Sequence, residues 1–296
     1  MTDLPMCVTC GVQFPADHDL SRCPICDEER QYVGYSGQQW TTAGELRAER
    51  SNVFRQEPRG LWGIGTEPAF AIGQRALVVP GTGADGEPAN LLWDCISLVD
   101  DETVWRVEEL GGLAAIAISH PHYYSAMVEW SEAFGGIPIY VHADDARWVE
   151  HCAPHGSEAV RLWEGDSFEV LPGRTLLNLR VHFAGGTVVH WPGMDGRGAV
   201  CSGDIIQVVA DRRWVSFMYS YPNLIPEHPD TVRRAVGMLE PYEFDVVYGA
   251  WWDKVVDGDS AGDAVGDSVG DSAEGGAKAA VRRSAERYLH HLGERL

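Results

Sequence analysis

The amino-acid sequence predicts an α/β fold in which mixed β-sheets are buried between helices, preceded by a small module at the N-terminus. Two observations carry this prediction for the larger part. Short apolar runs bounded by glycine, proline or aspartate alternate along the chain with segments whose apolar residues recur at helical spacing. The chain has 296 residues, 45% of them hydrophobic, and 11 tryptophans, which is enough to bury one large core.

The N-terminal module is predicted from two Cys-x-x-Cys pairs, Cys7 with Cys10 and Cys23 with Cys26. Two intervening residues bring both sulfurs of a pair to one side of a turn, and four thiolates close a tetrahedron around one ion. The pattern resembles zinc-ribbon modules and predicts a structural zinc, which would let residues 1–40 fold without a sufficient hydrophobic core. The alternative is a pair of disulfides, which is disfavoured because the rest of the chain indicates a reducing compartment.

The remainder of the chain, residues 41–296, is predicted to form one domain. Early strands are expected at residues 60–64, 70–72, 76–79 and 90–94. Helices are expected at about 101–110, 123–134 and 277–292, with a strand at 137–141. Between about 257 and 276 a Gly-Asp repeat predicts a flexible acidic insertion, because it has too few large apolar groups to offset its ordering entropy. Calcium binding by this repeat is the weaker alternative, since its period is short and irregular.

Candidate metal ligands follow strand-like apolar runs. His120 and His122 come directly after the run 113–118, and side chains at i and i+2 of an extended segment point to the same side. His182 and Asp204 end or interrupt two later apolar stretches and are flanked by glycines that allow tight turns. Neutral imidazoles are common ligands for zinc and iron. The four residues together predict a metal site.

The order of these motifs resembles the metallo-β-lactamase fold superfamily: His-x-His at 120–122, His-Phe-x-Gly-Gly from His182, and Ser-Gly-Asp ending at Asp204. The resemblance covers roughly residues 60–248, and the apolar run that ends at Asp94 fits the family's early strand. It implies a four-layer αβ/βα sandwich with the metal in loops that follow strands. It also implies that His120, His122 and His182 form the three-histidine site, and that Asp204 matches the aspartate that usually bridges two metals.

The chain departs from the family's His-x-His-x-Asp-His pattern, because Tyr124 and Ser125 take the last two places. The family's late histidine is also absent from residues 246–251. These positions normally furnish the second metal's ligands, so we expect a single ion. Tyr is a rare ligand and Ser a poor one for zinc. His142 follows another predicted strand and could line the same cleft, whereas His190 is interpreted as a hydrogen-bonded structural residue.

An open coordination position beside three histidines and an aspartate predicts a metal-dependent hydrolase. Zinc lowers the pKa of bound water toward neutrality and gives a metal-bound hydroxide that can attack an ester, thioester, lactone or amide. Asp204 would be a ligand and orienting group, with Tyr124 or His142 as candidate proton donors and the general base unassigned. Two alternatives stay open. The same ligands can hold Fe(II), as in the superfamily's mononuclear iron persulfide dioxygenases, or the domain could be a non-catalytic metal-binding module.

Composition restricts the partners. With 23 basic and 44 acidic residues the formal net charge is -21, which disfavours nucleic acid and anionic membrane surfaces and leaves a small-molecule substrate as the expectation. The first residues lack a secretion signal and no stretch is long and apolar enough to cross a membrane, so a cytoplasmic location is expected. The scattered Cys95, Cys152 and Cys201 are expected to be buried thiols. The sequence leaves the oligomeric state open.

Overall fold

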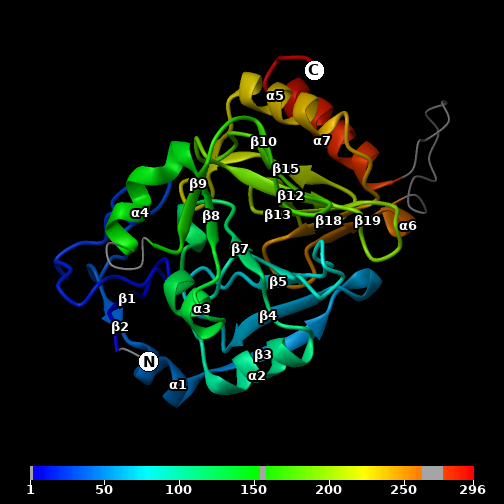
Figure 1. The fold of residues 1–296 in the computed structure, drawn as a ribbon. Helices are drawn as coiled ribbons and strands as arrows, with labels where there is room; N and C mark the ends of the chain where they lie inside the picture. Colours follow the sequence, from blue (N-terminus) through cyan, green and yellow to red (C-terminus); the bar gives the residue numbers. More distant parts are fainter. Residues whose placement is uncertain (1–2, 154–157, 262–275) are drawn as a thin grey trace.

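The computed structural model describes residues 3–153, 158–261 and 276–296. Two mixed β-sheets packed face to face form its centre (Figure 1). The first sheet runs in chain order through β3 (Ser51–Gln56), β4 (Trp62–Glu67), β5 (Ala76–Val79), β6 (Leu91–Trp93), β7 (Ala115–Ala117), β8 (Ile139–His142) and β9 (Val160–Trp163). The second has the order β10 (Ser167–Leu171), β11 (Arg174–Asn178), β12 (Thr187–Trp191), β13 (Ala199–Gly203), β18 (Val246–Gly249) and β19 (Val255–Asp257).

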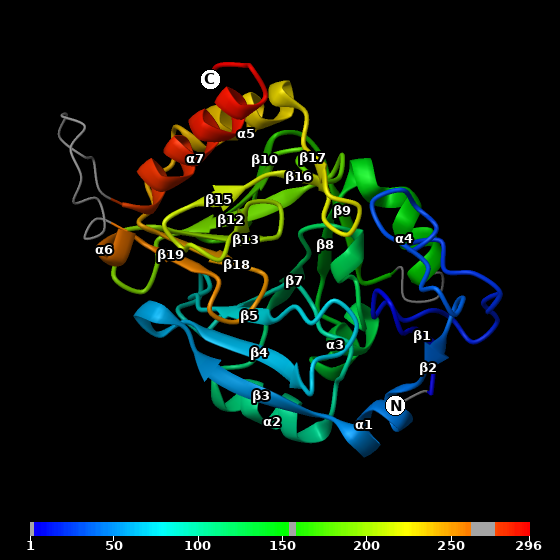
Figure 2. The same ribbon diagram turned by 180° about the vertical axis from the view of Figure 1, so that it is seen from behind.

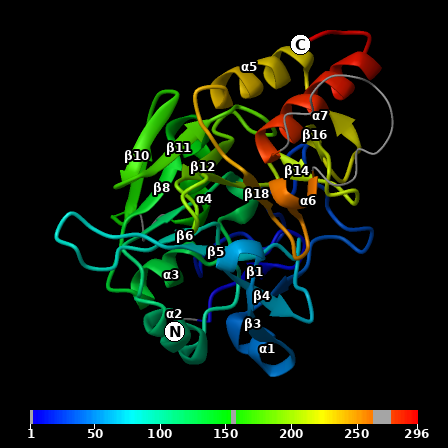
Figure 3. The same ribbon diagram turned by 90° about the vertical axis from the view of Figure 1, so that its right-hand side faces the viewer.

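Helices cover both outer faces of this pair of sheets. The helices on the first sheet are α1 (Ala43–Glu49), α2 (Asp101–Glu109) and α3 (Met127–Ala133), with α4 (Ala146–Cys152) beside its β9 end. The helices on the second sheet are α5 (Pro229–Leu239) and α7 (Ala277–His291). In Figure 3, α5 and α7 lie above the sheets and α1 and α2 below them. The predicted four-layer αβ/βα sandwich is confirmed.

Shorter elements complete the chain. The two-stranded pairs are β1 (Met6–Cys7) with β2 (Trp40–Thr41), β14 (Gln207–Val208) with β15 (Val215–Ser216), and β16 (Met218–Ser220) with β17 (Ile225–Pro226). The short helices are η1 (Pro58–Gly60), η2 (Pro121–Tyr123), η3 (Ala143–Asp145) and α6 (Gly258–Ala261). Among the helices within the described ranges, none combines the length and apolar character that a membrane span requires.

The side-chain period of two along the central strands separates three apolar cores. Leu92 of β6 and Ile116 of β7 face the helices of the first sheet, where they join one core. Their neighbours Trp93 and Ala117 face the second sheet. A third core lies between the second sheet and the pair α5 and α7, and it includes Val188, Val200, Val247, Leu239 and Leu289. Three cores between four layers account for the burial of both faces of both sheets.

The N-terminal module packs on the first of these cores. Its Met6, Val12 and Phe14 are fully buried in the same cluster as Leu46 of α1 and Trp130 of α3. Hydrogen bonds also join the two parts, since the Ser97 hydroxyl donates to the carbonyl of Gly11 at 2.7 Å. Figure 2 shows the module beside α4. The boundary near residue 40 is therefore crossed by buried contacts.

Several predicted elements are confirmed and others need correction. The helices expected at 101–110 and 277–292 are α2 and α7, and the Asp100 side chain caps α2 by accepting from the Thr103 amide. The strand expected at 70–72 is wrong, because the chain turns there, with φ of 52° at Ala71 and 74° at Gly73. The helix expected at 123–134 is interrupted after η2 and resumes as α3.

The first residues of the predicted acidic insertion belong to regular elements. Asp257 ends β19 and the next residues form α6, so the predicted start at 257 is wrong. The cause is charge pairing: the buried Arg59 side chain contacts Asp257 at 2.6 Å and Asp245 at 3.0 Å. These ion pairs fix the end of β19, although the composition of the sequence that starts there predicts disorder. The rest of the predicted insertion, residues 262–275, lies outside the described residues.

Candidate metal centre

The two histidines of the His-x-His motif stand where β7 ends, and a buried aspartate fixes the loop that carries them. Asp94 follows β6 with φ of 60°, and its Oδ1 accepts the amide of Ser119 at 2.8 Å. The Ser119 hydroxyl lies 2.9 Å from Nδ1 of His120. Because this contact engages Nδ1, Nε2 of His120 is directed toward the other ligand candidates.

His182 reaches the same place from the loop between β11 and β12 in the second sheet. Its backbone has φ of 67°, and its amide donates to Oε2 of Glu227 at 2.9 Å. Nδ1 donates to the carbonyl of Tyr219 at 2.7 Å, so Nε2 is the free nitrogen, and it lies 3.2 Å from Nδ1 of His122. The amide of Thr187 donates to the carbonyl of Ser119 at 2.9 Å, which ties the two histidine loops together.

Asp204 completes the group one residue after β13. Its Oδ1 lies 3.4 Å from Nε2 of His120. The preceding Gly203 has φ of 53°, and a Cβ there would lie 2.9 Å from the Ser119 hydroxyl and 3.0 Å from Oδ2 of Asp94. Only glycine lets the second sheet approach the histidine loop so closely.

Burial sets the charge state of the centre. The four side chains are 1–3% exposed. Desolvation lowers the pKa of His182 to about 3 and the pKa values of His120 and His122 well below the usual value, so all three imidazoles are neutral near pH 7. Burial raises the pKa of Asp204 to about 7, and the nearby Tyr123 opposes this rise.

A cation fits this arrangement. Nε2 of His120 and Oδ1 of Asp204 are buried, and neither has a hydrogen-bond partner among the described residues. Such atoms are costly unless they are ligands. The three histidines present ligand atoms within 4.8 Å of one another. The structure therefore brings together all four residues predicted for this site from the sequence.

The positions that the family uses for a second metal hold other contacts. The Ser125 hydroxyl accepts from Nε2 of Gln74 at 3.0 Å, and Gln74 also donates to the carbonyl of Cys95 at 2.9 Å. Tyr124 is fully buried in the first core, with its hydroxyl 3.4 Å from the carbonyl of Asp145. Instead of a late histidine, the turn after β18 is held by the buried Arg75, which donates to the carbonyls of Gly249 and Trp251.

His142 does not reach the centre. Its Nε2 donates to the carbonyl of Gly165 at 3.0 Å, and its Nδ1 accepts the amide of Asp144 at 3.1 Å. The ring also packs edge-on against Trp163. Both nitrogens are thus engaged in capping η3 and joining β8 to the next loop, so this placement does not support a role for His142 as proton donor. His190 contacts the Glu243 carbonyl at 2.8 Å, on the far side of the second sheet.

Three residues near the centre had no role assigned from the sequence. The ring of Tyr123 lies 4.4 Å from that of His120, and its hydroxyl is close enough to Asp204 to influence its pKa. The hydroxyl of Tyr221 donates to the Asp204 carbonyl, and its ring packs against His182. Arg30 of the N-terminal module lies over Phe183. Tyr123 is adjacent to the His-x-His motif and could have been considered, whereas Tyr221 and Arg30 are brought there only by the fold.

A second group of ligands lies in the N-terminal module. The four cysteines Cys7, Cys10, Cys23 and Cys26 are buried and their sulfurs lie within 4.8 Å of one another. Contacts with the other thiols lower the pKa of Cys7, whereas burial raises that of Cys10. A bound cation would allow all four to be thiolates. The predicted four-cysteine ribbon is confirmed as an arrangement of side chains.

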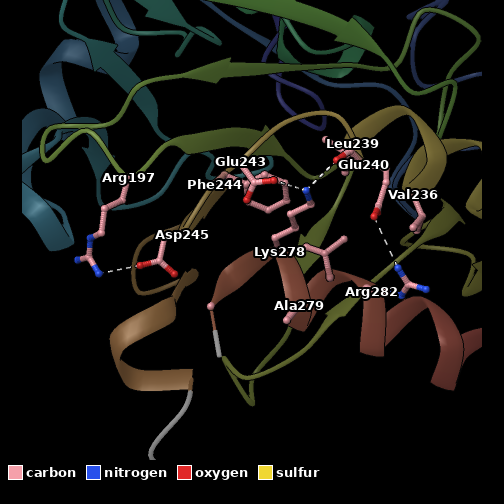
Figure 4. A pocket seen from close by; sticks show the side chains of 12 residues that line it. Arg197, Val236, Leu239, Glu240, Glu243, Phe244, Asp245, Lys278, Ala279 and Arg282 are labelled. Carbon is pink, nitrogen blue, oxygen red and sulfur yellow. Dashed lines mark hydrogen bonds and ion pairs between the residues drawn. The ribbon is translucent and has the colours of Figure 1, made fainter. Parts of the chain in front are cut away.

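A cavity elsewhere on the molecule is not lined by any of the candidate metal ligands. A cavity of about 560 Å³ lies between the end of α5, the following loop and α7 (Figure 4). Lys278 contacts Glu243 at 2.8 Å, and Arg282 contacts Glu240 at 3.7 Å. These charges are already paired, and the cavity contains no candidate metal ligand from the four-residue centre.

Comparisons with known proteins agree with this architecture. No protein-family model matches the sequence. The metallo-β-lactamase DIM-1 has a TM-score of 0.52 at 11% identity, covering 81% of this chain and 98% of its own. FIM-1 of Pseudomonas aeruginosa, a metallo-β-lactamase solved in a mono-zinc form, has a TM-score of 0.50 at 16% identity, covering 80% and 95%. Identities this low establish the fold alone.

A sequence relative covers nearly the whole chain. The uncharacterized protein YmaE of Bacillus subtilis (strain 168) is 42% identical over 295 residues, which are 98% of this chain and 97% of that protein. Both the ribbon and the sandwich therefore fall within the matched length. The chain belongs to the same family as YmaE, and it shares the fold of the metallo-β-lactamases.

Proposed function

We propose that the protein is a hydrolase of small-molecule esters, thioesters, lactones or amides that works with one metal ion held by His120, His122, His182 and Asp204. The observation that carries the proposal is the convergence of unpartnered ligand atoms from both sheets, with His120 Nε2 and Asp204 Oδ1 3.4 Å apart. When bound, zinc in such a site supplies a water of lowered pKa and polarises a carbonyl oxygen. The fold of the solved metallo-β-lactamases supports the same class.

The surrounding residues support the ligands. Ser119 orients His120 through Nδ1, and the Tyr219 carbonyl orients His182 in the same way. Burial raises the pKa of Tyr123 well above 10, so its hydroxyl keeps its proton and can donate toward Asp204. We therefore assign Tyr123 as a positioning residue for Asp204. Tyr124, the proton donor expected from the sequence, is instead buried in the first core.

The proposal of a single ion rests on the occupied second position. Ser125 is hydrogen-bonded to Gln74, and Tyr124 is directed into the first core. Neither can turn to a metal without breaking a buried contact, which costs about 1–3 kcal/mol for each unsatisfied group. Of the residues that bind a second metal ion in the superfamily, this chain then keeps only Asp204.

The partners and location follow as parts of the same proposal. A formal net charge of -21 favours a small-molecule substrate over nucleic acid or an anionic membrane surface. Four free thiols in the ribbon suit a reducing compartment, and we propose the cytoplasm.

The test is turnover by protein of defined metal content. Protein loaded with zinc should hydrolyse members of a panel of esters, thioesters, lactones and amides, and His182→Ala should hydrolyse none of them. Turnover should not change when oxygen is removed. Activity that requires iron and consumes oxygen would replace the hydrolase with the dioxygenase alternative. Full metal loading with no turnover of either kind would favour the non-catalytic module.

A further inference from the structure

We propose that Arg30, which the ribbon places beside the metal centre, binds an anionic group of the substrate. This inference rests on the proposed function and narrows its substrate to molecules that carry a carboxylate or phosphate near the bond that is broken. Arg30 lies four residues after Cys26, so the segment that closes the cysteine site also delivers the guanidinium.

The position of Arg30 is fixed by contacts with β16 and the turn between β16 and β17. The Ser220 hydroxyl donates to the carbonyl of Arg30 at 3.0 Å. The Asn223 side chain donates to the carbonyls of Glu29 at 2.9 Å and Gln31 at 3.2 Å. Three consecutive carbonyls of the ribbon are therefore bound to β16 and the turn after it, and the carbonyl of Tyr219 in β16 also accepts from His182. The ribbon and the metal centre share this support.

The guanidinium adjoins the aromatic ring that packs against the histidines. Cζ of Arg30 lies 4.7 Å from the ring centre of Phe183 and 4.3 Å from that of Tyr219. The ring of Phe183 in turn lies 4.9–5.4 Å from the rings of His120, His122 and His182. Arg30 is thus part of the electrostatic environment of the centre.

Part of the guanidinium is available to a ligand. Its Nη1 pairs with Glu28, while its buried Nε has no hydrogen-bond partner among the described residues. The side chain is 15% exposed. A buried guanidinium donor without a partner is costly, and a planar carboxylate or a phosphate would satisfy it through charge-assisted hydrogen bonds. In a chain with 44 acidic residues, a cation held at this place favours an anionic ligand.

A surface pocket lies beside Tyr219, although Arg30 itself does not line it. It has a volume of about 440 Å³ and is lined in part by Tyr219 and Glu227. Both residues also bond His182, Tyr219 through its carbonyl and Glu227 through its carboxylate. Tyr219 therefore has the pocket, His182 and Arg30 as neighbours.

The experiment measures anion binding to the full-length, metal-loaded protein by calorimetry. Glutarate is the carboxylate probe, inorganic phosphate is the phosphate probe, and glutaramide is the neutral control. The variants are Arg30→Gln and, as a control with the same charge change in the same module, Arg22→Gln. Arg22 is 63% exposed in its side chain and pairs with Asp27. Metal content of the cysteine site is measured for each variant.

We expect Arg30→Gln to weaken one of the two anions about tenfold or more, as the loss of a charge-assisted hydrogen bond implies. Arg22→Gln should change it less than about twofold, because the charge is exposed and screened. The anion that responds identifies the class. Equal losses in the two variants, or no loss in Arg30→Gln with its ribbon metal retained, would overturn the proposal.

Two further arms keep the result decisive. If Arg30→Gln loses the ribbon metal, the Arg30→Lys variant is measured instead. It keeps the positive charge but lacks the planar guanidinium that binds an anion through two parallel hydrogen bonds, so anion binding should be weakened severalfold. Anion binding equal to that of the wild type would refute the proposal. Turnover of 4-nitrophenyl butyrate and of mono(4-nitrophenyl) glutarate separates the two proposals. If the protein hydrolyses these esters but anion binding does not depend on Arg30, only this inference is refuted. If anion binding depends on Arg30 but no ester is hydrolysed, only the proposed function is refuted.

Discussion

His120 and Asp204 face each other across the two sheets, with Nε2 of one 3.4 Å from Oδ1 of the other. His120 follows β7 in the first sheet, and Asp204 follows β13 in the second. An ion bound between them would therefore link the two halves of the sandwich. The His120 loop is also linked without metal to the His182 loop of the second sheet, by the hydrogen bond from the Thr187 amide to the Ser119 carbonyl.

The first prediction concerns the ribbon, whose apolar residues share a core with the sandwich. Cys23→Ser should release one metal ion and lower the free energy of unfolding by at least about 2 kcal/mol, because buried apolar contacts and hydrogen bonds are lost together. Hydrogen exchange should speed up at the buried amides of Ser97 and Ser125, because Gly11 and Gln13 of the ribbon cover these residues by bonding the Ser97 hydroxyl and the Ser125 carbonyl. Cys152→Ser, outside the ribbon, is the control. Unchanged exchange at both serines would show that the ribbon folds independently.

The second prediction assigns His142 to structure. His142→Ala should lower the free energy of unfolding by roughly 2–3 kcal/mol, since it removes hydrogen bonds to Gly165 and Asp144 and the contact with Trp163. Metal content should stay at the wild-type value in the same preparation. The exposed His291 provides the control His291→Ala, which should be neutral. Loss of metal from the sandwich in His142→Ala would place this residue in the centre after all.

The third prediction is a pH dependence of stability at Asp145. Burial raises the pKa of Asp145 to about 7, while the amide of Gly185, which donates to its Oδ1 at 3.1 Å, lowers it. The folded protein thus binds the proton more tightly than the unfolded chain, so the contribution of this group to stability falls as pH rises from about 4 to about 7.

Asp145→Asn keeps the acceptor for Gly185 and removes this titration. It should be more stable than wild type at pH 8 by roughly 1–3 kcal/mol, and the difference should shrink at pH 5. Urea unfolding at both pH values measures it. A variant that is less stable than wild type at pH 8 would refute the assignment.

The fourth prediction concerns Ser125. Ser125→Ala should leave the metal content unchanged and cost roughly 1 kcal/mol, because Gln74 loses one acceptor but keeps its bond to Cys95. Metal analysis and thermal unfolding check both parts. A fall in bound metal on this substitution would mean that Ser125 is a ligand.

The sequence predicted the central sheets and the four ligands because both are local patterns. Apolar runs such as that ending at Asp94 become buried strands, and a ligand at the end of each run reaches the same edge of the sandwich. The turn at residues 70–72 was misread as a strand, since a short apolar triplet does not reveal a left-handed Ala71.

Contacts between distant segments could not be predicted in this way. The choice of Tyr123 rather than Tyr124 as neighbour of Asp204 depends on the 3₁₀ turn η2, which sets the direction of consecutive side chains. The approach of Arg30 to Phe183 joins residues 153 positions apart and depends on how the ribbon packs on the sandwich. No periodicity or motif in the sequence encodes such a contact.

Metal analysis combined with anomalous scattering at the zinc and iron edges tests the central claim most directly. The account predicts one ion in the sandwich, bound by His120, His122, His182 and Asp204, and one in the four-cysteine ribbon. His182→Ala should lose the first ion and retain the second. Two ions in the sandwich of the unmodified protein, or one ion bound away from these four residues, would contradict it.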